Sequence, residues 1–185
     1  MIFGNPEKFA LFIEPVTYIS GVDDYDCFGG FIINNKSYIS DGTVMLYTQK
    51  DLVVGGALVN TPDHEEYYSL PLDECFKRMM NYRYYNYIAE TEEEFENKDF
   101  TYYDYNELLF DAQLESSSVG SKRYQMFCIG HEESVRLISY IYPMESDYLQ
   151  LSDLSIYEIN ECFLIKNELN EIIDKLLSYK YDYTP

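Results

Sequence analysis

RYQMFCIGHEESVRLISYIY, residues 123–142, carries the clearest structural pattern of the chain. Two runs rich in aromatic and β-branched residues, 123–129 and 134–142, flank the short polar segment from Gly130 to Glu133. This pattern is typical of a β-hairpin, because strands favour such side chains and a polar interruption with glycine favours a turn. Pro143 lacks the amide hydrogen that a strand donates, so the second strand should stop there. The pattern predicts two neighbouring antiparallel strands.

The flanking residues extend this hairpin into a meander. In residues 107–115, apolar side chains occupy every second position from Leu108 to Leu114, which is the period of a half-buried strand. Residues 116–121 then predict a turn, and residues 154–164 predict a further strand. A C-terminal helix is predicted over residues 165–178, with Asn167 as its N-cap. Apolar residues recur there at spacings of three and four, at Leu169, Ile172, Ile173, Leu176 and Leu177.

The N-terminal half also predicts mainly strands. Residues 9–16 alternate as a first strand, and Pro15 and Gly21 with Asp23-Asp24 mark its exit. Residues 27–33 form a second apolar run. Asn34-Asn35-Lys36 is a turn signal that leads into residues 37–39, so these two elements predict a hairpin. Residues 43–59 are apolar but fit either a strand or a short helix.

A short strand at 67–70 and a helix at 71–83 are predicted next. Pro71 suits a first helical turn, and Asp73 and Glu74 complement its positive end. Together the elements predict an α+β fold: a mostly antiparallel sheet with hairpins and a meander, packed by a few helices including a C-terminal one. A length of 185 residues predicts a single domain over residues 1–185.

The segment 82–105 differs in composition from the rest of the chain. It contains seven tyrosines and seven acidic residues, but its basic residues are only Arg83 and Lys98. This acidic, tyrosine-rich segment is either a solvated loop or helix face, or a docking patch whose tyrosines give contact area and whose carboxylates accept Arg or Lys. The candidate partner-binding residues are Tyr84, Tyr85, Tyr87, Glu92, Glu93, Glu94, Glu96, Asp99, Tyr102, Tyr103 and Asp104.

The whole chain is strongly acidic. It has 33 acidic and 13 basic residues, for a net charge of −20. This charge disfavours nucleic acid and anionic membranes as partners, and it favours a basic protein partner by long-range attraction. Simple solubility is the alternative explanation. No signal peptide and no membrane-spanning segment is evident, so we expect a cytoplasmic protein. The oligomeric state is not readable from the sequence.

Catalytic and metal-binding motifs are missing from the sequence. Cys27, Cys75, Cys128 and Cys162 are far apart and lie among apolar residues, which favours small buried side chains in a reducing compartment. The triplets His64-Glu65-Glu66 and His131-Glu132-Glu133 fall in predicted turns and lack metal-ligand spacing. No glycine-rich phosphate loop or nucleophile elbow occurs. We therefore predict no catalytic residue, no metal and no cofactor.

The first fourteen residues resemble a known family. The opening run Met1-Ile2-Phe3-Gly4-Asn5-Pro6-Glu7-Lys8-Phe9-Ala10-Leu11-Phe12-Ile13-Glu14 is similar to the start of a bacterial immunity-protein family, the one numbered forty-two. Weaker resemblance covers residues 29–36 and parts of residues 108–138. The acidic, tyrosine-rich segment lies outside the resemblance.

The resemblance implies an α+β protein that binds a toxin delivered between neighbouring bacterial cells and blocks it without being an enzyme. Two alternatives remain open at this point. One is an acidic intracellular adaptor or regulator, or a nucleic-acid mimic, that binds a basic host protein. The other is a small hydrolase that uses an unrecognised carboxylate or pairs Cys128 with His131.

Overall fold

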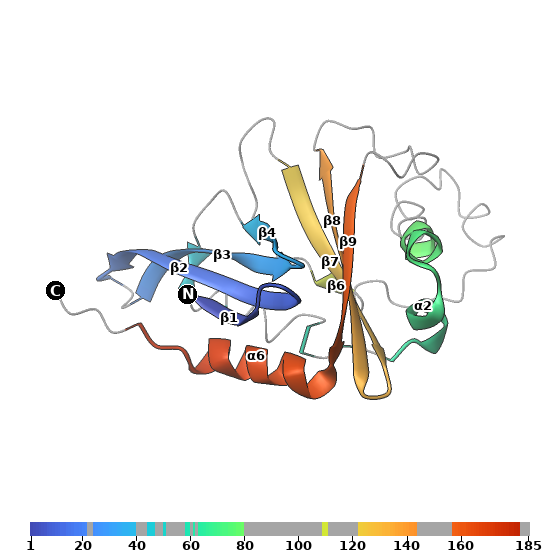
Figure 1. Ribbon diagram of the computed structural model, residues 1–185. Coiled ribbons are helices and arrows are strands. Elements are labelled where there is room, and N and C mark those ends of the chain that lie inside the picture. Colours follow the sequence, from blue (N-terminus) through green and yellow to red (C-terminus); the bar gives the residue numbers. More distant parts are fainter. Residues whose placement is uncertain are drawn as a thin grey trace, which may run out of the picture.

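The structure is a computed structural model that describes residues 1–21, 24–39, 44–46, 50, 58–59, 61, 63–79, 109–110, 122–143 and 157–181. Its strands form two antiparallel sheets (Figure 1). Sheet A has the order β1-β2-β3-β4, and β5 also pairs with β3. Its strands are β1 (Ile2–Asn5), β2 (Phe9–Ile19), β3 (Asp24–Ile33), β4 (Lys36–Ile39) and β5 (Val44–Met45). Sheet B has the order β6-β7-β8-β9, with β6 (Leu109–Phe110), β7 (Lys122–His131), β8 (Ser134–Pro143) and β9 (Glu158–Ile165).

The predicted N-terminal hairpin is present as β3 and β4. Asn34 and Asn35 both have positive φ angles, of 50° and 64°, as the tight turns between twisted strands require. The first strand was predicted over residues 9–16, and in the structure it is longer. A register shift between Pro15 and Thr17 accommodates the proline within the strand, and β2 continues to Ile19.

β1 was missed by the sequence analysis. It pairs with β2 from Ile2 opposite Phe12 to Asn5 opposite Phe9. The chain reverses between the two strands, where the Lys8 amide donates to the Asn5 carbonyl at 2.9 Å. Four residues are too few to show an alternating pattern of their own.

The predicted meander is confirmed in sheet B. β7 pairs with β8 from Lys122 opposite Pro143 to His131 opposite Ser134, and β8 pairs with β9. Of the strand predicted at 107–115, the described part is β6. The strand predicted at 154–164 is described from Glu158 as β9, and residues 144–156 lie outside the described residues.

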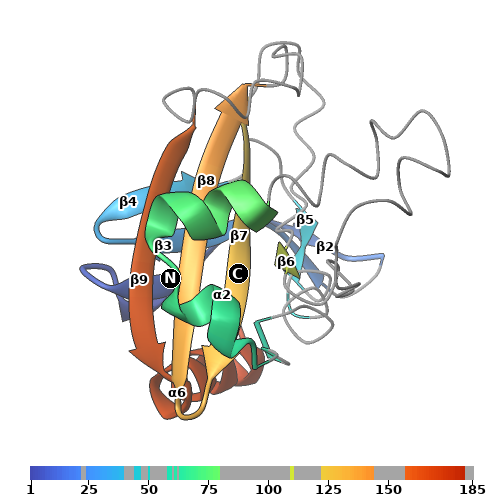
Figure 2. The same ribbon diagram turned by 90° about the vertical axis from the view of Figure 1, so that its right-hand side faces the viewer.

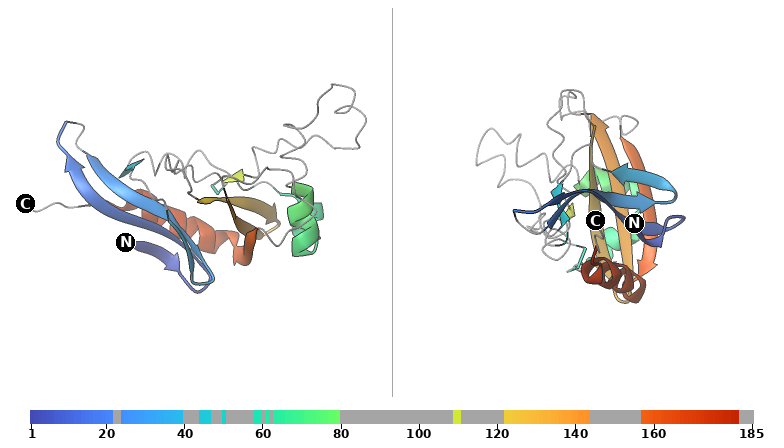
Figure 3. Two further views of the ribbon diagram at one scale, coloured as in Figure 1. Left: turned by 90° about the horizontal axis from the view of Figure 1, so that it is seen from above. Right: turned by 90° about the vertical axis from the view of Figure 1, so that its left-hand side faces the viewer.

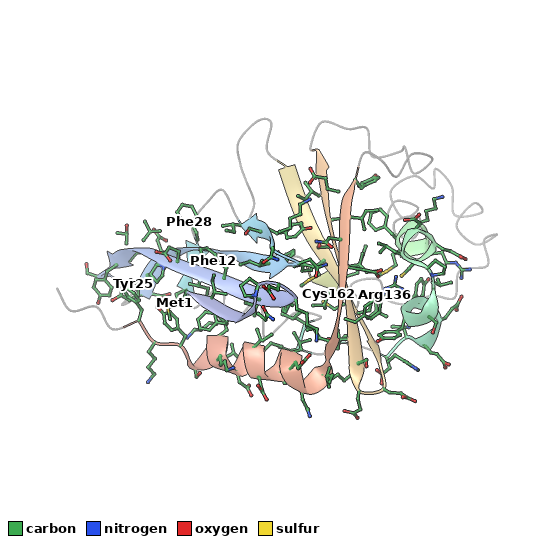
Figure 4. The ribbon with its side chains drawn as sticks, in the orientation of Figure 1. Met1, Phe12, Tyr25, Phe28, Arg136 and Cys162 are labelled. Atoms are coloured by element: carbon green, nitrogen blue, oxygen red, sulfur yellow. The ribbon has the colours of Figure 1, made fainter. Side chains whose placement is uncertain are left out.

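Sheet B separates two hydrophobic clusters because its side chains alternate. Even positions of β7 and odd positions of β8, such as Cys128 and Leu137, pack with sheet A and α6 (Lys166–Ser178). The intervening positions, such as Phe127 and Tyr140, pack with α2 (Glu65–Ser69) and with helical residues 72–79. Figure 4 shows Cys162 and Arg136 on opposite sides of the sheet.

The helices cover opposite faces of sheet B. α6 runs beneath sheet A and reaches the lower end of sheet B, whereas α2 and the helical residues 72–79 cross the far side (Figures 1 and 2). The predicted C-terminal helix is confirmed, but its N-cap is Ile165 and not Asn167. The Glu168 carboxylate accepts a hydrogen bond from the Ile165 amide at 3.2 Å, so the acid of the first turn satisfies that end of the helix.

The short strand predicted at 67–70 is wrong, because these residues belong to α2 and its C-cap Leu70. The helix predicted at 71–83 is confirmed over residues 72–79. The ambiguous stretch 43–59 contains β5, and most of its remainder lies outside the described residues. No helix in the described ranges is long and apolar enough to cross a membrane.

The view from above shows sheet A on one side and sheet B with its helices on the other (Figure 3). Phe12 alternates with Leu11 and Ile13, which face the core, so Phe12 lies on the face of sheet A away from α6. Phe28 lies on the same outer face, because it pairs with Glu14 (Figure 4).

Candidate interaction surface

The partner-binding residues predicted from sequence lie outside the described residues. This holds for all of them: Tyr84, Tyr85, Tyr87, Glu92, Glu93, Glu94, Glu96, Asp99, Tyr102, Tyr103 and Asp104. The acidic, tyrosine-rich segment therefore stays a prediction.

The four cysteines are free and buried, as predicted. Burial is the main cause that raises their thiol pKa values, because the charged thiolate loses its solvation. The pKa rises to about 12 for Cys27, to about 11 for Cys75 and to about 12 for Cys162. Burial also raises the pKa of Cys128 far above its ordinary range. These thiols are small apolar core groups in their protonated form.

We expect the thiols of the folded protein to react slowly with Ellman's reagent at pH 8, and all four to react at once in denaturant.

The raised pKa values of the thiols also make the stability of the fold depend on pH. Between the ordinary thiol pKa of 9.0 and the raised values, the native state binds more protons than the unfolded state. The free energy of unfolding should therefore fall as the pH rises above about 9. Rapid labelling of the native chain at pH 8 would contradict the expected slow reaction of the buried thiols.

A Cys128–His131 catalytic pair is incompatible with the structure. The two residues are three positions apart on β7, so their side chains leave opposite faces of the sheet. Cys128 is fully buried in the cluster shared with sheet A, while His131 lies beside Tyr68 of α2 with ring centroids 5.2 Å apart. The two side chains therefore cannot share a proton.

Neither His-Glu-Glu triplet forms a metal site. His64 is the N-cap of α2, and its amide donates to the Gly130 carbonyl at 2.8 Å. Glu65 and Glu66 form the first turn of α2, which corrects the prediction of a turn there. Within the described ranges, no group of three His, Cys, Asp or Glu side chains has the arrangement of a metal site.

A cavity of about 340 Å³ lies between the N-terminal end of α6 and residues 58–61. Its lining mixes apolar and polar side chains, and Lys166 is its charged residue. The Lys166 ammonium is held by the Asp63 carboxylate at 2.8 Å. The lining thus offers no acid–base pair and no nucleophile beside a base.

Arg136 is a buried arginine that fixes α2 to sheet B. It lies near the start of β8, and its side chain is 2% exposed. The guanidinium donates to the Glu161 carboxylate from Nε at 2.9 Å, and a second nitrogen lies 2.8 Å from the same oxygen. Its remaining terminal nitrogen donates to the carbonyls of Tyr67 and Tyr68, both at 3.1 Å, and of Leu70 at 2.6 Å. These carbonyls lie at the C-terminal end of α2, where the helix dipole places a partial negative charge. The cationic guanidinium stabilises that charge.

An aromatic group lies next to this arginine at the surface. The Phe163 ring of β9 stacks over the Arg136 guanidinium at 5.6 Å and meets the Tyr68 ring edge-on at 5.7 Å. Phe163 and Ile165 are on the same face of β9 and are 46% and 51% exposed. The turn residue Glu133 lies next to the end of β9, because the Lys166 amide donates to the Glu133 carbonyl at 2.8 Å, and Glu132 precedes it in the same turn. We name this area the hairpin surface and define it as Tyr68, His131, Glu132, Glu133, Phe163 and Ile165.

The surroundings of the hairpin surface are acidic. Neither Glu132 nor Glu133 forms an ion pair with another described residue, and both are exposed. Arg78 pairs with both the Glu66 and the Glu74 carboxylates, at 2.6 and 2.7 Å. Because one positive charge meets two negative ones, the two ion pairs leave part of the negative charge unneutralised. The area therefore combines exposed apolar groups with unneutralised negative charge.

The sequence and the fold were compared with known proteins. The profile of the family described as immunity protein 42 matches residues 1–179, which is nearly the whole chain. The chain belongs to the immunity protein 42 family. The resemblance of its first residues is thus confirmed, and this protein is a toxin immunity protein whose family implies a cognate toxin as partner.

A solved structure shares the fold of this immunity protein. CdiI from Burkholderia dolosa AUO158 superimposes with a TM-score of 0.63 over 96% of this chain and 99% of the CdiI chain. The two sequences are 18% identical, so the likeness concerns the fold. A comparison with curated proteins found no match.

Proposed function

We propose that this immunity protein neutralises a basic toxin domain by forming a stoichiometric complex with it in the cytoplasm of the cell that it protects. The observation that carries the proposal is the family match over residues 1–179. The net charge of −20 supports a basic partner, because opposite long-range charge raises the rate of encounter. In this proposal the protein acts by binding alone and catalyses no reaction.

Affinity purification of the tagged full chain from its native cells tests the proposal. The purification is run at low and at high salt, and the recovered proteins are identified by mass spectrometry. We expect one basic toxin domain, retained at low salt and depleted at high salt. Recovery of a cytosolic DNA-binding protein instead would favour the adaptor or nucleic-acid mimic and would contradict the proposal.

We further propose that the acidic, tyrosine-rich segment takes part in toxin binding. Replacing Glu92, Glu93 and Glu94 together by Lys should slow association about tenfold or more at low salt, because the run loses its attraction for Arg and Lys. Stopped-flow association with the purified toxin domain measures the effect.

The matched control for that variant changes the net charge equally at exposed acids elsewhere, by Glu7→Lys, Glu171→Lys and Asp174→Lys. Association rates that fall equally in the variant and in this control would show that only the total charge matters.

A further inference from the structure

We infer that the hairpin surface is a docking site for the toxin, and that it takes a basic protein surface on which Arg or Lys surrounds an apolar group. The inference rests on the proposed function and places the contact on described residues. It adds a second surface to the acidic, tyrosine-rich segment.

The exposed apolar groups of the hairpin surface are the first argument. Phe163 and Ile165 stay about half exposed at the end of β9, although α2 and the helical residues 72–79 cover Ile129 and Ile138 of the same sheet face. Figure 2 shows α2 crossing this face close to the turn between β7 and β8. Exposed apolar side chains with a polar rim are typical of protein interfaces, and aromatic residues often supply most of the binding energy.

The rigidity of the aromatic residues is the second argument. The guanidinium of Arg136 holds Phe163 from below at 5.6 Å and fixes the end of α2 that carries Tyr68. His131 lies against the other side of Tyr68, with ring centroids at 5.2 Å. Because these rings are already ordered, binding loses little conformational entropy.

Charge decides the kind of partner. Glu132 and Glu133 flank the apolar residues and make no ion pair with a described residue, while the neighbouring Lys166 is already paired with Asp63. Carboxylates in this position would accept Arg or Lys, and the faces of Tyr68 and Phe163 can stack with a guanidinium. Nucleic acid and anionic lipid would be repelled.

The hairpin surface also lies on the sheet face that the helical residues 72–79 cover. Phe76 packs against Phe127, Tyr140 and Tyr157 on this face. Met79 belongs to the same cluster, and the acidic, tyrosine-rich segment starts three residues after it, at Tyr82.

The test measures the affinity of the purified full chain for the toxin domain that affinity purification recovers with it. Phe163→Ala should raise the Kd at least tenfold, mainly through faster dissociation, because a rigid aromatic contact is lost. The matched control is Tyr18→Ala, since Tyr18 is an exposed aromatic residue at the far end of sheet A that also contacts a neighbouring ring. It should change the Kd less than twofold.

A second pair of variants tests the charge without touching the core. Glu132→Lys with Glu133→Lys should slow association about tenfold at low salt, and the effect should shrink at high salt. Glu7→Lys with Asp174→Lys is the control, because it changes the net charge equally at exposed sites outside the hairpin surface. Circular dichroism and thermal unfolding verify that each variant is folded before binding is measured.

The outcomes separate the two proposals. If the wild-type chain does not bind this toxin domain, the proposed function is wrong and the inference fails with it. If the wild-type chain binds, but both hairpin-surface variants bind as their controls do, the function stands and the docking site is wrong. Weaker binding by both hairpin-surface variants, with unchanged controls, supports the docking site.

Discussion

Replacing Arg136 by Met should lower the free energy of unfolding by about 3–5 kcal/mol, because it leaves a carboxylate and helix-end carbonyls without their cation. The guanidinium is 2% exposed and serves Glu161 together with the carbonyls that end α2. Methionine fills a similar volume, so lost packing contributes little. Urea unfolding followed by circular dichroism measures the change from the midpoint at constant slope.

Two further variants separate the parts of this loss. Arg136→Lys keeps the positive charge but loses the planar guanidinium with its several donors. It should therefore retain only some of the hydrogen bonds and lower the free energy of unfolding by an intermediate amount. Arg136→Met with Glu161→Met removes the unpaired carboxylate and should recover part of the stability. A single Arg136→Met variant within about 1 kcal/mol of wild type would contradict the role given to this arginine.

The consequences of Arg136→Met should extend to the hairpin surface. Arg136 lies under Phe163 and holds the α2 carbonyls of Tyr67 and Tyr68. Without it, the amides of α2 should exchange with deuterium faster than those of β7 and β8, since the helix loses its main polar link to the sheet. The same arginine thus connects the stability of the fold to the order of the candidate docking site.

Much of sheet B could be predicted from the sequence because its strands bury one or both faces. The runs around Met126 and Leu137 are rich in aromatic and β-branched residues, and the turn at Gly130 has the composition of a hairpin. α6 was equally clear, because Leu169, Ile172 and Leu176 recur at helical spacing and are buried. In these elements, the local pattern and the tertiary environment favour the same structure.

α2 could not be predicted because its sequence favours a different structure. Tyr67 and Tyr68 have high strand propensity, and a helix of five residues is too short to be stable on its own. It exists because Arg136, distant in sequence, binds its last carbonyls. Tertiary contacts of this kind override local propensity and leave no sign in the local sequence.

The hairpin surface was missed for a related reason. Tyr68, His131 and Phe163 come from separate parts of the chain, and only the pairing of β7, β8 and β9 with the packing of α2 brings them together. The triplet of His131, Glu132 and Glu133 was recognised in the sequence, but as a failed metal motif. The sequence signal that could have identified the site was Phe163, an apolar residue that alternates with Cys162 and Leu164 in the strand predicted at 154–164 and therefore lies on the opposite face.

Gly4→Ala is the second variant for which we expect a large effect, a loss of about 3 kcal/mol in the free energy of unfolding. Gly4 has a φ of +115°, which side chains of L-residues rarely adopt. A β-carbon there would lie 2.6 Å from the Phe9 carbonyl oxygen of β2 and 2.9 Å from Cδ1 of Ile172 in α6. The alanine must therefore strain its own backbone and also push β1 away from its neighbours.

Gly21→Ala is the matched control, because a β-carbon there meets no heavy atom within 4 Å. It should change stability by less than about 1 kcal/mol. Equal urea midpoints for the two variants would contradict the packing role of Gly4. The expected difference gives a physical reason for the glycine in the opening run that resembles the family. β1 and α6 lie at opposite ends of the sequence and contact each other, so only a residue without a side chain lets the first strand and the last helix close the same core.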